Sequence, residues 1–140
     1  MEYVVLGTWI VQGAVGVVLL TGWLRHARGR NASTVLTHVA LSLAGLVAWV
    51  WFLLSGTVIP AWIALGTLTV GNALGDSMLI RRHRRATGVT TGYWRDYGTT
   101  IAAVFRGGFP RPVAFHAVFA GVVYFTCLGV CIGATVAAAS

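Results

Sequence analysis

Charged residues are scarce in this sequence, and lysine is absent altogether. Only 9% of the 140 residues are charged, whereas a soluble domain carries about 25%. Hydrophobic residues make up 57% of the chain, and the mean hydropathy is +0.80. This composition excludes an ordinary water-soluble domain and indicates a protein that lies in a lipid bilayer.

Cysteine is also nearly absent. Cys127 and Cys131 lie four residues apart within one apolar run, where a disulfide inside a single helix is sterically poor. Two thiols alone make no zinc site either. We therefore expect both cysteines to be buried structural residues.

The few polar residues divide the chain into four long apolar runs, each close to the 20 or so residues that a membrane-spanning helix needs. We expect transmembrane helices at about 4–24, 35–54, 61–80 and 113–136. These spans and their short connections use almost all of residues 1–140, so no separate soluble domain remains. The predicted fold class is all-α, an integral membrane four-helix bundle that forms a single domain.

The basic residues are unevenly distributed between the connections. Three arginines lie between the first and second runs, seven lie between the third and fourth, and the remaining connection has none. By the positive-inside rule, both arginine-bearing connections are cytoplasmic, which puts both termini outside. We expect a multi-pass protein of a bacterial inner (plasma) membrane.

The net charge of +7 also limits the choice of partner. Because the arginines flank apolar runs, their expected partners are anionic lipid headgroups of the bilayer and not nucleic acid.

The long cytoplasmic connection contains a helical pattern at about 90–106. Its apolar residues recur at helical spacing, with Arg95 and Arg106 close by. They are Tyr93, Tyr97, Ile101, Val104 and Phe105. We expect a short helix on the inner membrane surface. An irregular loop is the alternative, because Gly98 weakens a helix there.

Small residues recur at every fourth position in three of the spans. The stripes are Ala40, Ala44 and Ala48 in the second span, Gly71 and Gly75 in the third, and Gly129 and Gly133 in the fourth. Such stripes let helix backbones approach closely in lipid. They predict a tight bundle that forms a homo-oligomer or joins a larger membrane complex.

Three ionisable residues lie inside the spans, where they are costly and are candidates for function. They are His38, Asp76 and His116. At 1.5 Å per residue, all three lie roughly 4 to 6 Å inside the cytoplasmic boundary. We therefore expect them to converge on one site, with Asn72, one turn deeper than Asp76, orienting its carboxylate.

A b-type haem is one chemistry that fits this cluster, because His38 and His116 on two helices can take both axial positions. Asp76 would then fix the orientation of one imidazole. Small residues near the histidines would leave room for a ring edge, namely Ser42, Gly45 and Ala120. The haem propionates would pair with arginines, namely Arg25, Arg28, Arg81 and Arg111.

Other interpretations of the same residues stay open. His38, His116 and Asp76 are also a familiar ligand set for a divalent metal ion. A His–Asp pair near the membrane surface can instead bind a quinone headgroup or relay protons. In the purely structural interpretation, the histidines bond to neighbouring carbonyls and Asp76 pairs with an arginine.

Several segments resemble small four-helix membrane proteins of actinobacterial type. These segments run from His38 to Trp49, from Gly75 through the arginines that follow it, and from Phe109 to His116. The resemblance implies the four-span topology and implies no reaction. The general plan is also similar to membrane b-type cytochromes, such as the cytochrome b561 class and the anchor subunits of succinate dehydrogenases. Because the outer half of this chain has no second histidine pair, that similarity implies at most one haem.

The leading hypothesis is an inner-membrane protein with one b-type haem between His38 and His116, acting as an electron-transfer or quinone-linked subunit. The alternatives are a cofactor-free accessory subunit of a larger membrane complex, and an enzyme or transporter with a His38/Asp76/His116 metal site. Enzymatic activity is left open by the sequence.

Overall fold

The computed structural model describes every residue of the chain except 27, 28 and 30, and the described residues form five α-helices and no strand. The helices are α1 (Glu2–His26), α2 (Ala32–Ser55), α3 (Val58–Thr87), α4 (Tyr93–Phe105) and α5 (Arg111–Ala139). All except α4 are long and apolar enough to cross a membrane. The predicted all-α membrane bundle is therefore confirmed. The long connection contains a helix, as expected, and is not an irregular loop.

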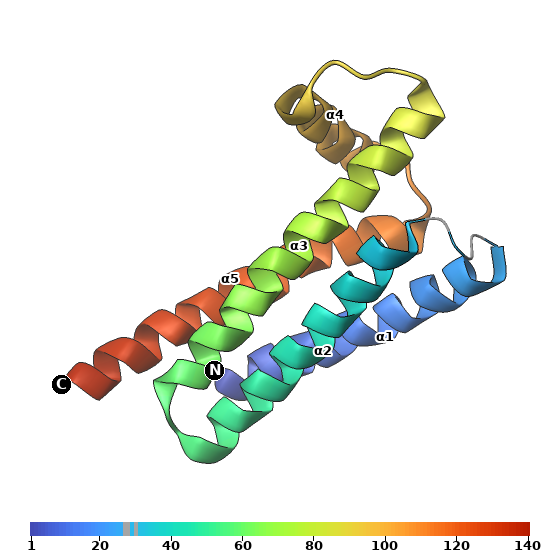
Figure 1. Ribbon diagram of the computed structural model, residues 1–140. Helices are drawn as coiled ribbons and strands as arrows, with labels where there is room; N and C mark the ends of the chain where they lie inside the picture. Colours follow the sequence, from blue (N-terminus) through green and yellow to red (C-terminus); the bar gives the residue numbers. More distant parts are fainter. Residues whose placement is uncertain (27–28, 30) are drawn as a thin grey trace.

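The four long helices run alongside one another, with both chain termini at the same end of the bundle (Figure 1). α2 packs against α3 and α1, and α5 packs against α1 and α3. α2 and α5 therefore occupy opposite corners. We call the far end, where α2 and α5 begin and where α4 lies, the arginine-rich end (Figure 1).

α3 is longer than its apolar run predicts. The run stops at Ile80, but the helix continues through the arginines to Thr87, because arginine is a good helix former and the backbone hydrogen bonds do not depend on apolar side chains. Gly88, at φ +69°, ends the helix, and its N–H donates to the Arg84 carbonyl oxygen. The last two turns of α3 provide the surface on which α4 packs (Figure 1).

The main hydrophobic core lies in the half of the bundle nearer the termini. Its largest members are Trp9, Trp49 and Phe52, and both cysteines are fully buried in it, as predicted. Cys131 Sγ donates to the Ala61 carbonyl oxygen at 3.3 Å. A separate small cluster of Leu79, Val104 and Phe109 fills the arginine-rich end.

The glycine stripes differ in what they face. A Cβ on Gly71 or Gly75 would touch side chains of α2, at 3.9 Å from Leu41 and 3.5 Å from His38. A Cβ on Gly129 or Gly133 would meet no described atom within 4 Å. The α3 stripe therefore packs inside the bundle, whereas the α5 stripe lies on its outer surface.

Gly45 permits the closest approach between helices in the core. A Cβ at this position would lie 2.6 Å from Thr67 Oγ1 and 2.8 Å from Trp9 Cζ2. We predict that Gly45→Ala destabilises the bundle by about 1–3 kcal/mol, the range for overpacking a core, because the rigid Trp9 indole must move. Unfolding in a denaturing detergent would measure the loss.

Gly66→Ala is the matched control, because Gly66 also lies in a membrane-spanning helix and a Cβ added there would meet no described atom within 4 Å. It should leave the free energy of unfolding nearly unchanged. Equal effects from the two variants would contradict the proposed role of Gly45.

Candidate functional site

The two histidines predicted to form a site face each other across the bundle. His38 lies in the second turn of α2, and His116 lies in the second turn of α5. Their ring centres are 6.2 Å apart, with the ring planes at 72°. Because α2 and α5 are opposite corners of the bundle, this contact requires both imidazoles to point into the interior. The structure thus brings together His38 and His116.

His38 is held in place by α3. Its Nδ1 lies 2.8 Å from the carbonyl oxygen of Gly71. Because a carbonyl only accepts hydrogen bonds, Nδ1 is the donor in this bond. The missing side chain of Gly75 lets the ring lie against α3, since a Cβ there would be 3.5 Å from His38 Cε1. The imidazole of His38 therefore packs on the Gly71 and Gly75 stripe.

His116 is held against α1. Gln12 Nε2 donates to the His116 carbonyl oxygen at 2.9 Å, and a Cβ on Gly16 would lie 3.4 Å from His116 Cε1. Gln12 Oε1 and His116 Nδ1 are buried and have no hydrogen-bond partner among the described residues. Each such atom costs on the order of 1–3 kcal/mol. Both orphaned atoms belong to residues at the site, so the site holds hydrogen-bonding capacity that helix packing does not use.

Gln12 is a site residue that sequence patterns do not assign to the histidine site. The polarity of Gln12 within an apolar span is a signal that marks it, and Gly16 follows it by one helical turn. The sequence does not give the rotation of α1 relative to α5, so it does not predict which residue the Gln12 amide contacts.

Asp76 does not join the histidines. Among the described residues, no group of three His, Cys, Asp or Glu side chains lies close enough to hold a metal ion. The described structure therefore does not group Asp76 with His38 and His116, and a metal ion bound by the two histidines stays a prediction. The reason that Asp76 is set apart is the rotation of one residue around the helix axis. Gly75 faces α2, and Asp76, the next residue, points about 100° away from that direction around α3.

The carboxylate of Asp76 instead lies within electrostatic range of α4. Its negative charge, together with partial burial, raises the pKa of Tyr97. Within the described part of the chain, Asn72 makes no hydrogen bond to Asp76, and its expected orienting role stays a prediction.

Two of the three small residues expected to leave room for a cofactor make contacts within the protein instead. The space above Gly45 is filled by the Trp9 indole, which corrects that expectation. Ser42 donates to the His38 carbonyl oxygen at 2.9 Å, a bond within α2. Ala120 is half-buried on α5, one turn beyond His116.

The arginines predicted to meet propionates have different surroundings. Arg81 is occupied, since it donates to the Ser77 carbonyl and hydroxyl oxygens and to Thr34 Oγ1. Arg25 and Arg111 are exposed at the arginine-rich end. Arg28 lies outside the described residues.

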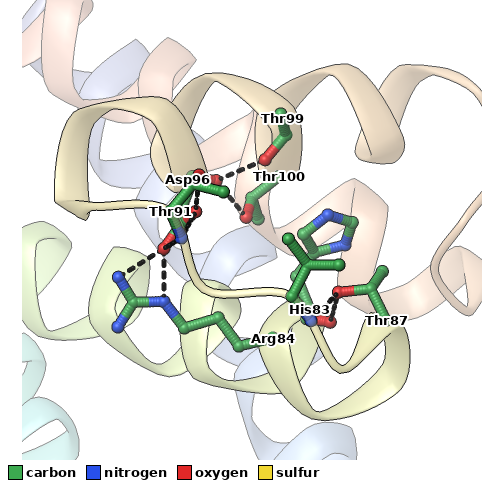
Figure 2. Close-up of polar contacts among 8 residues, drawn as sticks. His83, Arg84, Thr87, Thr91, Asp96, Thr99 and Thr100 are labelled. Carbon is green, nitrogen blue, oxygen red and sulfur yellow. Dashed lines mark hydrogen bonds and ion pairs between the residues drawn. The ribbon is translucent and has the colours of Figure 1, made fainter.

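A second polar cluster fixes α4 to α3 (Figure 2). Asp96 is only 3% exposed, and its Oδ2 lies 2.7 Å from Arg84 Nε and 2.6 Å from Arg84 Nη2. Its Oδ1 accepts the Thr91 hydroxyl at 2.7 Å and the Thr91 N–H at 3.1 Å. The Thr100 hydroxyl donates to the Asp96 carbonyl oxygen at 2.6 Å. We call this arrangement the Asp96 clasp.

Asp96 lies outside the membrane spans, where an ionisable residue carries no special cost and so draws no attention in a sequence. A lone acidic residue twelve positions after Arg84 gives little sign of pairing, since the turn at Gly88 and Gly92 decides whether the two helices meet.

Comparisons with protein-family models, with curated proteins and with solved structures found no match to this chain. Any functional assignment therefore depends on the geometry of its own residues.

The Asp96 clasp makes the attachment of α4 sensitive to acid. Hydrogen bonds from Thr91 and Arg84 and the charge of Arg84 lower the pKa of Asp96 from its ordinary value of 3.8 to about 2, although burial opposes this shift. Because the folded pKa is the lower one, the stabilisation is complete above about pH 4 and is lost as the pH falls through about 2. The protection factors of the α4 amides, obtained from hydrogen exchange between pH 5 and pH 2 after correction for the intrinsic exchange rate at each pH, should fall in that window.

At neutral pH, Asp96→Asn should speed exchange of the α4 amides at least about tenfold, because charged hydrogen bonds are lost. Asp76→Asn is the control, since it removes an equal charge from α3 without touching the clasp. If both variants exchange like the wild type, the clasp does not hold α4.

Proposed function

We propose that this protein is a membrane haem protein that holds one b-type haem between His38 and His116. The observation that carries the proposal is the 6.2 Å separation of the imidazole centres across the bundle. When two imidazole nitrogens each lie about 2 Å from one metal ion, the ring centres are roughly 6 Å apart. The spacing of this pair therefore suits a single ion between the rings.

The hydrogen bonds around the rings support the same assignment. An imidazole that binds a metal through one nitrogen usually donates its other N–H to a carbonyl or carboxylate, which fixes the tautomer. His38 already does so through Gly71. For His116, the unpaired Gln12 Oε1 is an acceptor and the unpaired Nδ1 is a potential donor, so the two orphaned atoms are chemically complementary.

The flanking helices offer small residues at this level. A ring standing between α2 and α5 would extend toward α1 and α3, and these helices present Gly16 and Gly75 beside the two imidazoles. At the arginine-rich end, Arg25 and Arg111 are exposed and form no ion pair with any described residue. We assign the pairing with propionates to these two arginines, because Arg81 is already bonded to Ser77 and Thr34.

A bound haem would supply one-electron transfer. We therefore propose an electron-transfer or quinone-linked subunit of a larger assembly in a bacterial inner membrane, with the arginine-rich end in the cytoplasm. The outward-facing Gly129 and Gly133 stripe is suited to close contact with another helix in that assembly or in a homo-oligomer.

Absorption spectroscopy of the purified protein tests the proposal. We expect haem to bind at one per chain, with a Soret band that shifts on reduction and a low-spin spectrum typical of two imidazole ligands. His38→Ala and His116→Ala should each abolish that spectrum, because each removes one axial ligand. His26→Ala, which alters an exposed histidine whose ring is hydrogen-bonded to Gly22 within α1, should leave it unchanged.

His116→Met separates loss of a ligand from loss of the fold. A methionine in that position keeps an axial ligand and should raise the reduction potential of the bound haem. A well-folded protein that binds no haem, or one whose spectrum survives both alanine substitutions, contradicts the proposal.

A further inference from the structure

α4 has three distinct faces around its axis. The face that packs on the rest of the protein carries Asp96, Thr100 and Val104, all of them buried. Asp96 bonds to Arg84 of α3, and Val104 packs with Leu79 and Phe109. These contacts determine how the helix is rotated, so the directions of its other two faces follow.

One of the remaining faces is apolar and largely open. At 100° per residue, its five members fall within an arc of about 120°. They are Tyr93, Tyr97, Ile101, Trp94 and Phe105. Trp94 is 81% exposed and Phe105 is 73% exposed. A helix in water would not gain from presenting two such side chains together.

The third face is polar and lies on the other side of the helix. Arg95 and Thr99 lie there, and they line a cavity of about 370 Å³ together with His83 and Thr87 of α3. Arg95 is exposed and has no ion-pair partner among the described residues.

α3 shows which of these faces is turned toward the bilayer. Tyr97, on the apolar face, interacts electrostatically with Asp76, which lies before the end of the apolar run. Arg95 and Thr99 share a cavity with His83 and Thr87, seven and eleven residues farther along α3. That is roughly 10 to 17 Å farther from the membrane interior. The apolar face is thus on the side of the lipid, and the polar face is on the side of the water.

We propose that α4 is an anionic-phospholipid-binding helix, which seats Trp94 and Phe105 among the acyl chains and holds Arg95 on the water side of the headgroup layer, where its charge attracts the headgroup phosphates. The occupant is the bilayer that the protein spans, because α4 ends only six residues before α5 begins. Charge complementarity favours anionic lipid. Arg82 and Arg85 on the last turns of α3 are also exposed, and no described acidic residue pairs with them. The proposal does not depend on haem binding.

Spin labels on the two open faces test the orientation. Phe105→Cys places a label on the apolar face, and Thr99→Cys is the matched control on the polar face. Cys127 and Cys131 are fully buried, and wild-type protein treated in the same way measures their background labelling. In vesicles of phosphatidylglycerol and phosphatidylcholine, the label at 105 should be more accessible to oxygen than to a water-soluble nickel chelate. The label at 99 should show the reverse.

Equal exposure of both labels to the chelate would overturn the proposal, because α4 would then project into water. Protection of the label at 105 from both reagents would also overturn it, since the apolar face would then be covered by protein.

Lipid charge tests the second half of the proposal. Binding should weaken in vesicles of phosphatidylcholine alone, which the label at 105 would report as greater access to the chelate. In anionic vesicles, Arg95→Gln should shift the equilibrium between inserted and exposed α4 by about fivefold, the effect of one arginine near a charged surface. Arg30→Gln removes an equal charge from the connection between α1 and α2 and should leave it unchanged. A label at 105 that responds neither to lipid charge nor to Arg95→Gln would refute the anionic preference.

Discussion

The hydrogen bond from His38 Nδ1 to the Gly71 carbonyl oxygen is the interaction on which the site depends. Inside a bilayer no water is available to satisfy a polar side chain, so an imidazole there must find its partner within the protein. A glycine one turn away, Gly75, lets the ring reach the backbone of α3. The bond therefore joins α2 to α3 and fixes the ring that faces His116.

The same constraint operates at His116 with a different outcome. Its carbonyl oxygen is bonded by Gln12, but its Nδ1 and the Gln12 Oε1 are both left without partners among the described residues. Among the described residues, these are the two buried side-chain polar atoms that lack a hydrogen-bond partner, and both belong to residues at the histidine pair. The Nδ1 atom of His38 is thus hydrogen-bonded whereas that of His116 is not, and this contrast supports the proposal that the site holds a ligand.

The sequence predicts the parts of this structure that depend on composition and on position along one helix. The four spans, the helix at α4 and the burial of Cys127 and Cys131 all follow from runs of apolar residues and their spacing. Depth in the membrane also follows, because each residue adds a constant rise. Counting residues from the span ends therefore places His38 and His116 correctly at the same level.

The sequence does not supply the rotation of each helix about its own axis relative to its neighbours. Asp76 has the right depth for the histidine site, but one residue of rotation from Gly75 turns it away from His38 and toward α4. Gly45 looks like free space in a sequence and is instead filled by Trp9 of another helix. Asp96 pairs with Arg84 only because two glycine-containing turns fold α4 back onto α3. Each of these outcomes is decided by the rotation of one helix against another, which no single-helix pattern records.

α3 connects the two polar centres of the molecule. It carries the Gly71 carbonyl that anchors His38 and the Arg84 guanidinium that anchors α4. These residues are thirteen positions apart on one helix with no proline between them, so they are separated by about 20 Å along a nearly rigid rod. The level of α4 relative to the histidines is therefore fixed by α3. If α4 rests at the headgroup layer, the imidazole pair must lie below the membrane surface but within a few turns of it, where the exposed arginines would be within reach of the acidic groups of the proposed haem. The length of α3 beyond its apolar run therefore determines both the depth of the candidate site and the placement of α4.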